Sequence, residues 1–317
     1  MAMVDNFSNR LYSPASEIDI ESLFLQARQL IFQGQILEAY KLFNEYIKNT
    51  LSADEQCRYW DGSDLRGGRL YIFDEWLFID RTFGNHSELI GLGDYLQYAR
   101  YFSFLAKLDS QITIKCNQAL HRLFRYNFPN LTFTADKPTC YDYLFFGCSL
   151  PAVFSSISSK PYLKASQPIY LPKTDKLRIG ICWAASVKMR SIPLKAFEPI
   201  LKLSNCEFWA IQKGNALAEL AEYSHRLNHI ELQDFDHTAA VVNELDLIIS
   251  VDTSVAHLAG SIGKPVWVLL PLDADARWGS NTTQTDWYST MRLFRQPEQD
   301  NWATPISEVS LALKQLV

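Results

Sequence analysis

The chain has 317 residues with a formal net charge of −5, and 48% of them are hydrophobic and 13% aromatic, which is typical of a globular protein with about two packed cores. The charge gives no reason to expect nucleic acid or an anionic membrane as a partner. The six cysteines show no zinc spacing, and no segment reaches the roughly 20 apolar residues that cross a bilayer. We therefore expect a cytoplasmic protein with reduced thiols, no structural metal, no nucleic-acid partner and no transmembrane segment.

The amino-terminal part is expected to be helical after a flexible start. Residues 1–16 are polar and irregular, as chain termini often are. Residues 17–51 carry two amphipathic helical patterns that meet near Gly34, with the small residues Ala27 and Ala39 where the helices would touch. This pattern predicts a helical hairpin that packs on the next domain, with docking of a partner as the alternative.

Residues 52–160 predict a first α/β domain. Up to residue 68 the segment carries turn residues and predicts a linker. Strand and helix patterns then alternate. We expect strands over 69–80, 111–116 and 141–148, and helices over 94–108 and 117–126.

Two glycines, Gly91 and Gly93, come directly before Asp94 at the start of one of these helices. They permit a close backbone turn and place the carboxylate in the first turn of the helix. Asp94 then either caps the helix, which is the commonest use of Asp at such a place, or presents a carboxylate at the carboxyl edge of the sheet.

Residues 161–176 contain three prolines and no periodic pattern, which predicts an interdomain linker. Residues 177–317 alternate strands and helices again, and this alternation implies a parallel sheet that is covered on both faces. The expected strands are 177–183, 207–212, 228–232, 245–251 and 266–270, and the expected helices are 192–203, 215–223, 237–245, 254–262 and 306–316.

The segment 245–271, LDLIISVDTSVAHLAGSIGKPVWVLLP, predicts a strand, a tight turn, a helix and a second strand. The turn at Asp252, Thr253 and Ser254 provides side-chain oxygens that suit a helix start. A helix N-terminus at the carboxyl edge of a parallel sheet attracts anions, so this turn is a candidate phosphate site. His257 lies one helical turn deeper and either donates to a phosphate oxygen or holds the turn in place.

Other charged residues fall in turns at the same edge. Turn 184–191 carries Lys188 and Arg190, and turn 212–214 carries Gln212 and Lys213. The cations would converge with the helix N-terminus on one anionic ligand. The plain alternative is that they are solvated surface residues.

The loop that follows residue 270 is rich in Trp and Arg, and long loops are commonly functional. Trp278 would line a ligand cleft, unless it is simply packed as aromatic residues more often are. The loop also contains D-A-D at 273–275, but no other acidic residue can be placed beside it. We therefore expect no metal here.

Together the motifs resemble a known family, that of tetratricopeptide (TPR) repeat proteins whose carboxyl-terminal domain is similar to the family 9 ADP-heptose:lipopolysaccharide heptosyltransferases. The hairpin resembles one TPR unit. The other matching pieces are GLGDYLQYARY, RSIPL, IQKG, the 245–271 segment and WYSTMRLFRQ, in the expected order. The resemblance implies the GT-B fold, an α/β architecture of two Rossmann-like domains that face each other across a cleft, the first for the acceptor and the second for the nucleotide-sugar donor.

The resemblance also implies residue roles. Asp94 would be the general base that acts on the acceptor hydroxyl, and the turn 252–254 with His257 would hold the diphosphate of the donor. Residues and resemblance together give donor-binding candidates Thr253, Ser254, His257, Asp252, Lys213, Gln212, Lys188, Arg190 and Trp278, and acceptor-binding candidates Gly91, Gly93 and Gln97.

The leading hypothesis is an inverting, metal-independent glycosyltransferase that uses a nucleoside-diphosphate sugar and no cofactor, with an acceptor that is a glycan, a lipid or a protein. Such chemistry needs one positioned carboxylate and a preorganised cationic cradle. The alternative is a non-catalytic module, a degenerate transferase that senses a nucleotide sugar or joins partners through the hairpin. Another GT-B activity, such as a nucleotide-sugar epimerase, ranks last.

Overall fold

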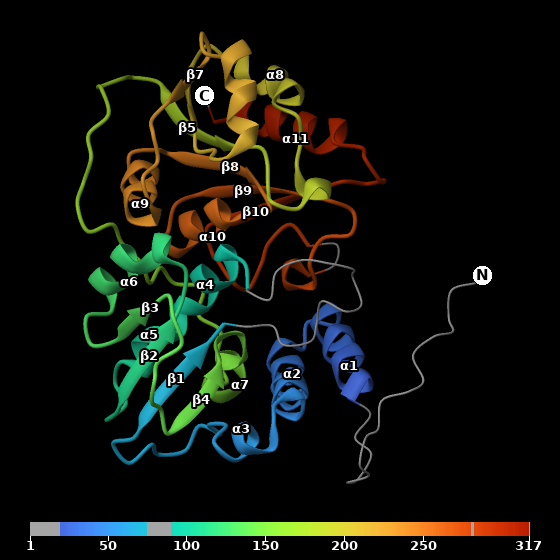
Figure 1. The fold of residues 1–317 in the computed structure, drawn as a ribbon. Helices are drawn as coiled ribbons and strands as arrows, with labels where there is room; N and C mark the ends of the chain where they lie inside the picture. The colour runs from blue at the N-terminus through green and yellow to red at the C-terminus, as the bar shows by residue number, and fades with distance from the viewer. Residues whose placement is uncertain (1–19, 75–89, 280–281, 317) are drawn as a thin grey trace.

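The computed structural model describes residues 20–74, 90–279 and 282–316, which form two parallel sheets, one above the other in Figure 1. We call the part built on the four-stranded sheet the first lobe and the part built on the six-stranded sheet the second lobe. The predicted flexible start, residues 1–16, and residues 75–80 of the predicted 69–80 strand lie outside the described residues. No helix among the described residues is long and apolar enough to cross a membrane.

The chain begins its described part with the expected helical hairpin, α1 (Ile20–Phe32) and α2 (Ile36–Thr50). Gly34 turns the chain between them with a φ of +77°, a left-handed conformation that glycine adopts without steric strain. Ala27 and Ala39 are buried, as expected of small residues at a helix contact. α2 packs on α7 (Leu150–Phe154) of the first lobe, and α1 contacts the short helix η8 (Ala276–Trp278) of the second. The hairpin therefore touches both lobes.

The predicted linker at 52–68 is wrong in part, because it contains the short helix α3 (Ala53–Cys57). Ser52 and Glu55 form a capping box, in which the Ser52 hydroxyl accepts from the Glu55 amide and the Glu55 carboxylate accepts from the Ser52 amide. Tyr59 and Trp60 follow and are buried against Phe145. The segment is thus part of the first lobe's core.

The sheet of the first lobe has the strand order β3-β2-β1-β4, and all its pairs are parallel. Leu70 in the central strand pairs with Ile112 on one side and with Tyr143 on the other. The three-residue strand β3 was not expected, since it is too short to show a period. The strands are β1 (Arg69–Phe73), β2 (Gln111–Lys115), β3 (Thr132–Thr134) and β4 (Tyr143–Phe146). The helices are α4 (Leu92–Tyr98), η2 (Ala99–Tyr101), α5 (Phe102–Leu105), η3 (Gln118–Leu120), α6 (His121–Asn127), η4 (Gly147–Ser149) and α7.

The sheet of the second lobe has the order β10-β9-β8-β5-β6-β7 and is also parallel throughout. Its central strand β8 is buried at every residue, as expected for a strand covered on both faces. The strands are β5 (Leu177–Cys182), β6 (Cys206–Ala210), β7 (Leu227–His229), β8 (Leu247–Val251), β9 (Val266–Leu270) and β10 (Met291–Arg295). The helices are η5 (Lys188–Arg190), η6 (Leu194–Phe197), α8 (Glu198–Leu201), η7 (Asn215–Glu222), α9 (Phe235–Asn243), α10 (Ser254–Ser261), η8 and α11 (Ala303–Lys314).

Two expectations for this lobe are corrected. The segment 291–295 is the edge strand β10 and not loop, and it pairs with β9 because its apolar residues continue the buried sheet. The helix expected over 215–223 is a 3₁₀ helix, η7, with no buried residue.

The strand order of this sheet reverses between β5 and β8. The edge beyond the carboxyl ends of these two strands is therefore the topological switch point, where open α/β sheets bind ligands.

The lobes meet where α10 packs against α4, at the junction of the two layers in Figure 1. The expected linker 161–176 contains no helix or strand, and the amides of Tyr162 and Leu163 donate to the carbonyl of Ser261 at the end of α10. Arg100 adds a buried bridge, because its Nη1 donates to the carbonyls of Ser158 and Trp287 at 2.8 Å each. The Tyr162 hydroxyl donates to the Leu96 carbonyl at 2.7 Å, so the linker is fixed to both lobes.

Candidate active site

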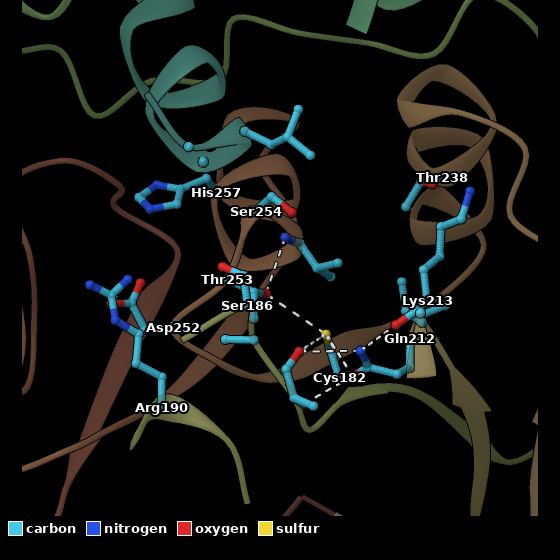
Figure 2. Close-up of a pocket in the computed structure, with 18 of the residues that line it drawn as sticks. Cys182, Ser186, Arg190, Gln212, Lys213, Thr238, Asp252, Thr253, Ser254 and His257 are labelled. Atoms are coloured by element: carbon cyan, nitrogen blue, oxygen red, sulfur yellow. Dashed lines mark hydrogen bonds and ion pairs between the residues drawn. The ribbon is translucent and has the colours of Figure 1, made fainter. Parts of the chain in front are cut away.

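A cavity of about 800 Å³ lies between the lobes and includes the switch point. Its walls come from the start of α4, from the segments that follow β5, β6 and β8, and from the loop that contains η8. Most of the expected site residues line it. Gly91, Gly93 and Asp94 come from the first lobe, and Figure 2 shows those of the second, namely Arg190, Gln212, Lys213, Asp252, Thr253, Ser254 and His257. Gln97, Lys188 and Trp278 are not among the lining residues.

The N-terminus of α10 forms part of the cavity wall. Thr253 is its N-cap, and the Thr253 Oγ1 accepts a hydrogen bond from the Val255 amide at 3.2 Å. The same hydroxyl lies 3.1 Å from Ser250 Oγ on β8, so the turn is tied to the strand. Ser254, the first helical residue, is partly exposed to the cavity. The positive end of the helix dipole therefore faces the space in which an anion would bind.

Gln212 shapes the cavity. Its Oε1 accepts from the amides of Trp183 and Ala184 at 3.1 and 2.9 Å, and its Nε2 donates to the Lys213 carbonyl at 2.9 Å. These bonds hold the segment after β5 against the segment after β6. The amide of Gln212 is therefore engaged by the backbone.

Lys213 and Arg190 line opposite sides of the cavity, with Thr253 and Ser254 between them (Figure 2). Lys213 is exposed, and its Nζ donates to a backbone carbonyl at 3.3 Å. Arg190 Nη1 lies 3.2 Å from Asp252 Oδ2, and Asp252 is only 4% exposed. Burial raises the pKa of Asp252, while the charge of Arg190 opposes that rise. Asp252 thus anchors Arg190 at the cavity wall.

Asp94 fits both readings that the sequence left open. Its Oδ2 accepts a hydrogen bond from the Gly91 amide at 2.9 Å, which caps α4. Its Oδ1 lies 2.6 Å from Nη1 of Arg277 in the other lobe. The carboxylate therefore caps its helix with one oxygen and forms an ion pair in the cavity with the other.

Arg277 is a cavity residue that the sequence did not single out. Its Nη1 also donates to Gln97 Oε1 at 2.6 Å, and its Nε donates to Asp275 Oδ1 at 3.0 Å. Burial opposes the charge of Arg277, but Asp275 and Asp94 outweigh that effect and hold its pKa well above the usual range. Burial likewise opposes ionisation of Asp275, yet Arg277 lowers the pKa of Asp275 to about 2. Both side chains are charged at neutral pH.

The signal for Arg277 was present in the sequence as the acid-x-Arg spacing of DADAR. In the sequence the motif draws attention only through its two carboxylates, which lack a further acidic partner for a metal. In the structure Asp275 is the ion-pair partner of Arg277, two residues away. A loop without periodicity gives no indication of which lobe its side chains will face.

His257 is packed between the lobes and is only 3% exposed. Its Nδ1 lies 2.9 Å from the hydroxyl of Tyr288, and its ring stacks on Trp278 with centroids 5.2 Å apart. Burial and the nearby charges of Arg277 and Arg100 hold the pKa of His257 well below its usual range, so the ring is neutral. The ring thus braces the loop that contains Trp278 and Tyr288, which is neither of the two predicted roles, and Trp278 lies behind the cavity wall.

No protein-family profile matches the chain. Among solved structures, a family 9 glycosyltransferase from Veillonella parvula aligns over 80% of this chain and 98% of its own, with a TM-score of 0.51 and 13% identity. The ADP-heptose lipopolysaccharide heptosyltransferase II of Escherichia coli aligns over 78% of this chain and 99% of its own, with a TM-score of 0.50 and 11% identity. The fold is GT-B. At sequence identities this low, the similarity to these structures establishes the fold alone.

The sequence is also distantly related to protein FlbA of Caulobacter vibrioides, with 24% identity over 353 aligned positions. The alignment covers 95% of this chain and 56% of FlbA, so the chain spans about half the length of this relative.

Proposed function

We propose that the chain is a glycosyltransferase that moves a sugar from a nucleoside-diphosphate sugar to a hydroxyl group of an acceptor, with inversion at the anomeric carbon. The observation that carries the proposal is the interlobe cavity, which brings the Asp94 carboxylate of the first lobe to the same space as the α10 N-terminus of the second. A base and an anion site on facing walls are what this reaction requires.

In the proposed reaction Asp94 accepts the proton of the acceptor hydroxyl. The acceptor oxygen forms a bond to the anomeric carbon as the bond from that carbon to the diphosphate oxygen breaks. The nucleoside diphosphate leaves with the electron pair, and the α10 N-terminus with Arg190 and Lys213 stabilises its charge. The scheme assigns no step to a metal ion.

The division of labour follows the GT-B fold. We assign the acceptor to the first lobe, within the proposed domain 52–160, and the donor to the second lobe, within 177–317. The names of the two similar structures, a family 9 glycosyltransferase and an ADP-heptose transferase, support a nucleotide-sugar donor. Glycan, lipid and protein acceptors are distinguished by transfer assays.

A second candidate is a module that binds a nucleotide sugar without transferring it. It is favoured by one observation, namely that both oxygens of Asp94 already have partners, Gly91 and Arg277. In this state an acceptor hydroxyl has to compete with these two donors for the carboxylate. Binding without turnover would then be the whole activity.

A thermal-shift screen against ADP-, GDP- and UDP-sugars tests the donor site. A ligand at 100 times its dissociation constant stabilises the folded protein by about 2.7 kcal/mol, and we expect one nucleotide class to do so. Absence of any shift would remove the donor site.

The nucleotide sugar that binds is then assayed for hydrolysis and for transfer to glycan, lipid and peptide acceptors. We expect Asp94→Asn to retain donor binding and to lose transfer about 100-fold or more, because general-base catalysis contributes 10²–10⁴-fold. Asp109→Asn is the matched control, since Asp109 is an exposed residue of the same lobe outside the cavity. Full activity of Asp94→Asn excludes Asp94 as the base, and binding without any wild-type turnover establishes the non-catalytic module.

A further inference from the structure

The ion pair between Asp94 and Arg277 joins the two lobes inside the cavity. Both side chains are largely buried, with exposed fractions of 16% for Asp94 and 18% for Arg277. Separation of the pair would leave the Asp94 carboxylate without its ionic partner in a poorly hydrated space, whereas Arg277 would keep Asp275. The resting pair therefore favours the state in which Arg277 is held by Asp94.

The hydrogen bonds of Arg277 determine what a ligand must displace. Within the described part of the chain its contacts to Asp94, Gln97 and Asp275 use four of the five N–H donors of the guanidinium. A phosphate group that binds arginine in the preferred bidentate way needs two donors. Arg277 must therefore release at least one partner to hold a phosphate.

Asp94 is the partner that can be released. Asp275 lies two residues from Arg277 on the same segment and moves with it. Gln97 is neutral, so an anion that displaces it from Arg277 breaks a weaker electrostatic contact. Its release, however, leaves no charged side chain free. Asp94 lies on the facing lobe, and both Asp94 and Arg277 line the cavity. A dianionic phosphate competes with this single carboxylate more strongly than a neutral ligand would.

On the basis of the proposed function, we infer that the diphosphate of the donor takes the Arg277 guanidinium from Asp94. Donor binding then has two effects in one exchange. Arg277 joins Arg190 and Lys213 in neutralising the diphosphate, and Asp94 Oδ1 becomes free to receive the proton of the acceptor hydroxyl. The resting ion pair keeps the base inactive until the donor is in place.

Packing contacts hold the segment that contains Arg277 at the cavity, so we expect the exchange to need only side-chain rotation. α1 of the hairpin contacts η8, which contains Arg277, and the neighbouring Trp278 stacks on the buried His257 ring. Tyr40 of α2 packs edge-on against Trp287 of the same loop, with centroids 6.0 Å apart. Arg277 therefore stays at the cavity after it leaves Asp94.

The test measures the dissociation constants of inorganic pyrophosphate, ADP, GDP and UDP by calorimetry for wild type, Asp94→Asn, Arg277→Gln and the double variant. We expect Asp94→Asn to bind the best of these probes about tenfold more tightly, and Arg277→Gln about tenfold more weakly, than wild type. The double variant should have the same affinity as Arg277→Gln, because Asp94 no longer holds a guanidinium away from the anion once Arg277 is absent. Arg277→Met, which keeps the aliphatic stem and removes the charge, replaces Arg277→Gln if the latter does not fold.

Arg69→Gln is the matched control. Arg69 also forms an ion pair with an aspartate, Asp142 at 2.8 Å, but neither residue lines the cavity. Its substitution should leave the affinity for the probes unchanged.

The outcomes separate the inference from the proposed function. Wild type that binds a probe no less tightly than Asp94→Asn overturns the exchange and leaves the donor site intact. The exchange is also overturned if Asp94→Asn increases the affinity for a probe by the same factor in wild type and in Arg277→Gln. Simple repulsion between Asp94 and the anion would then account for the effect. If none of the proteins binds any probe, the proposed donor site fails and the exchange fails with it.

Discussion

Gly93 lies against His257 where the start of α4 meets the helix α10. A Cβ atom at this position would lie 2.8 Å from Cδ2 and 3.4 Å from Nε2 of the His257 ring. The ring cannot easily move away, because its Nδ1 is bonded to Tyr288 at 2.9 Å and Trp278 stacks on its face. We therefore predict that Gly93→Ala forces α4 and α10 apart and destabilises the protein.

The magnitude follows from the overlap. One extra methyl group in a site that cannot relax destabilises a core by about 1–3 kcal/mol. Unfolding entropy of about 2.1 cal/mol/K per residue over the 317 residues converts this into a Tm lower by about 2–5 °C. Donor turnover should fall as well, because Asp94 is the next residue on the displaced helix.

A differential scanning calorimetry series checks the reasoning. Gly91→Ala is the control, since a Cβ at Gly91 meets only one oxygen of Asp94, at 3.2 Å. His257→Ala removes the ring, so adding Gly93→Ala to that variant should cause little further loss. If Gly93→Ala has the Tm of wild type, or if it lowers the Tm equally in the His257→Ala background, the contact with the His257 ring does not determine which residues position 93 tolerates.

Two further predictions follow from buried polar groups. The lowered pKa of His257 means that below about pH 6.5 the unfolded chain binds a proton at this residue while the folded chain does not. The free energy of unfolding should therefore fall as pH decreases from 7 to 5, by up to about 1.4 kcal/mol per pH unit from this group. Thermal melts of His257→Gln should show a shallower decline with pH. Tyr40→Phe removes the buried hydroxyl contact to Tyr98, 2.5 Å long, and should destabilise by about 1–3 kcal/mol, measured as a lower Tm. Tyr170→Phe, at an 85% exposed site, should have no effect, and an equal loss in both variants would contradict the role of the hydroxyl pair.

Regular apolar patterns made most of the fold predictable. The strand–turn–helix–strand unit of residues 245–271 is present as β8, α10 and β9, because a buried parallel strand and an amphipathic helix each leave a clear signal. β3 and β10 were not expected, since one is three residues long and the other follows an aperiodic loop. Their pairing depends on neighbouring strands that a local pattern does not reveal.

The candidate site was predictable where the side chains follow strands directly. The turns after β5, β6 and β8 all reach the cavity, because the carboxyl ends of parallel strands share one edge. Arg277 and the packing of His257 depend on contacts between lobes, and sequence spacing carries no information about these. Gln97 is predicted to bind the acceptor, and in the structure it is buried and accepts a hydrogen bond from Arg277. The roles of the residues at the cavity remain predictions.

The hairpin α1–α2 cannot be treated as a detachable module. Its inner aromatic residues Tyr40, Phe43 and Tyr46 are buried in the same chain, so a shortened protein that starts at residue 52 would expose their partners Tyr98 and Trp287. A protein partner, if the hairpin has one, is limited to its outer face, where Leu25 and Phe32 are exposed. The smallest unit that can be expressed, crystallised or fused to another protein therefore includes these two helices, and a relative without them would need another means of holding the loop that contains Arg277.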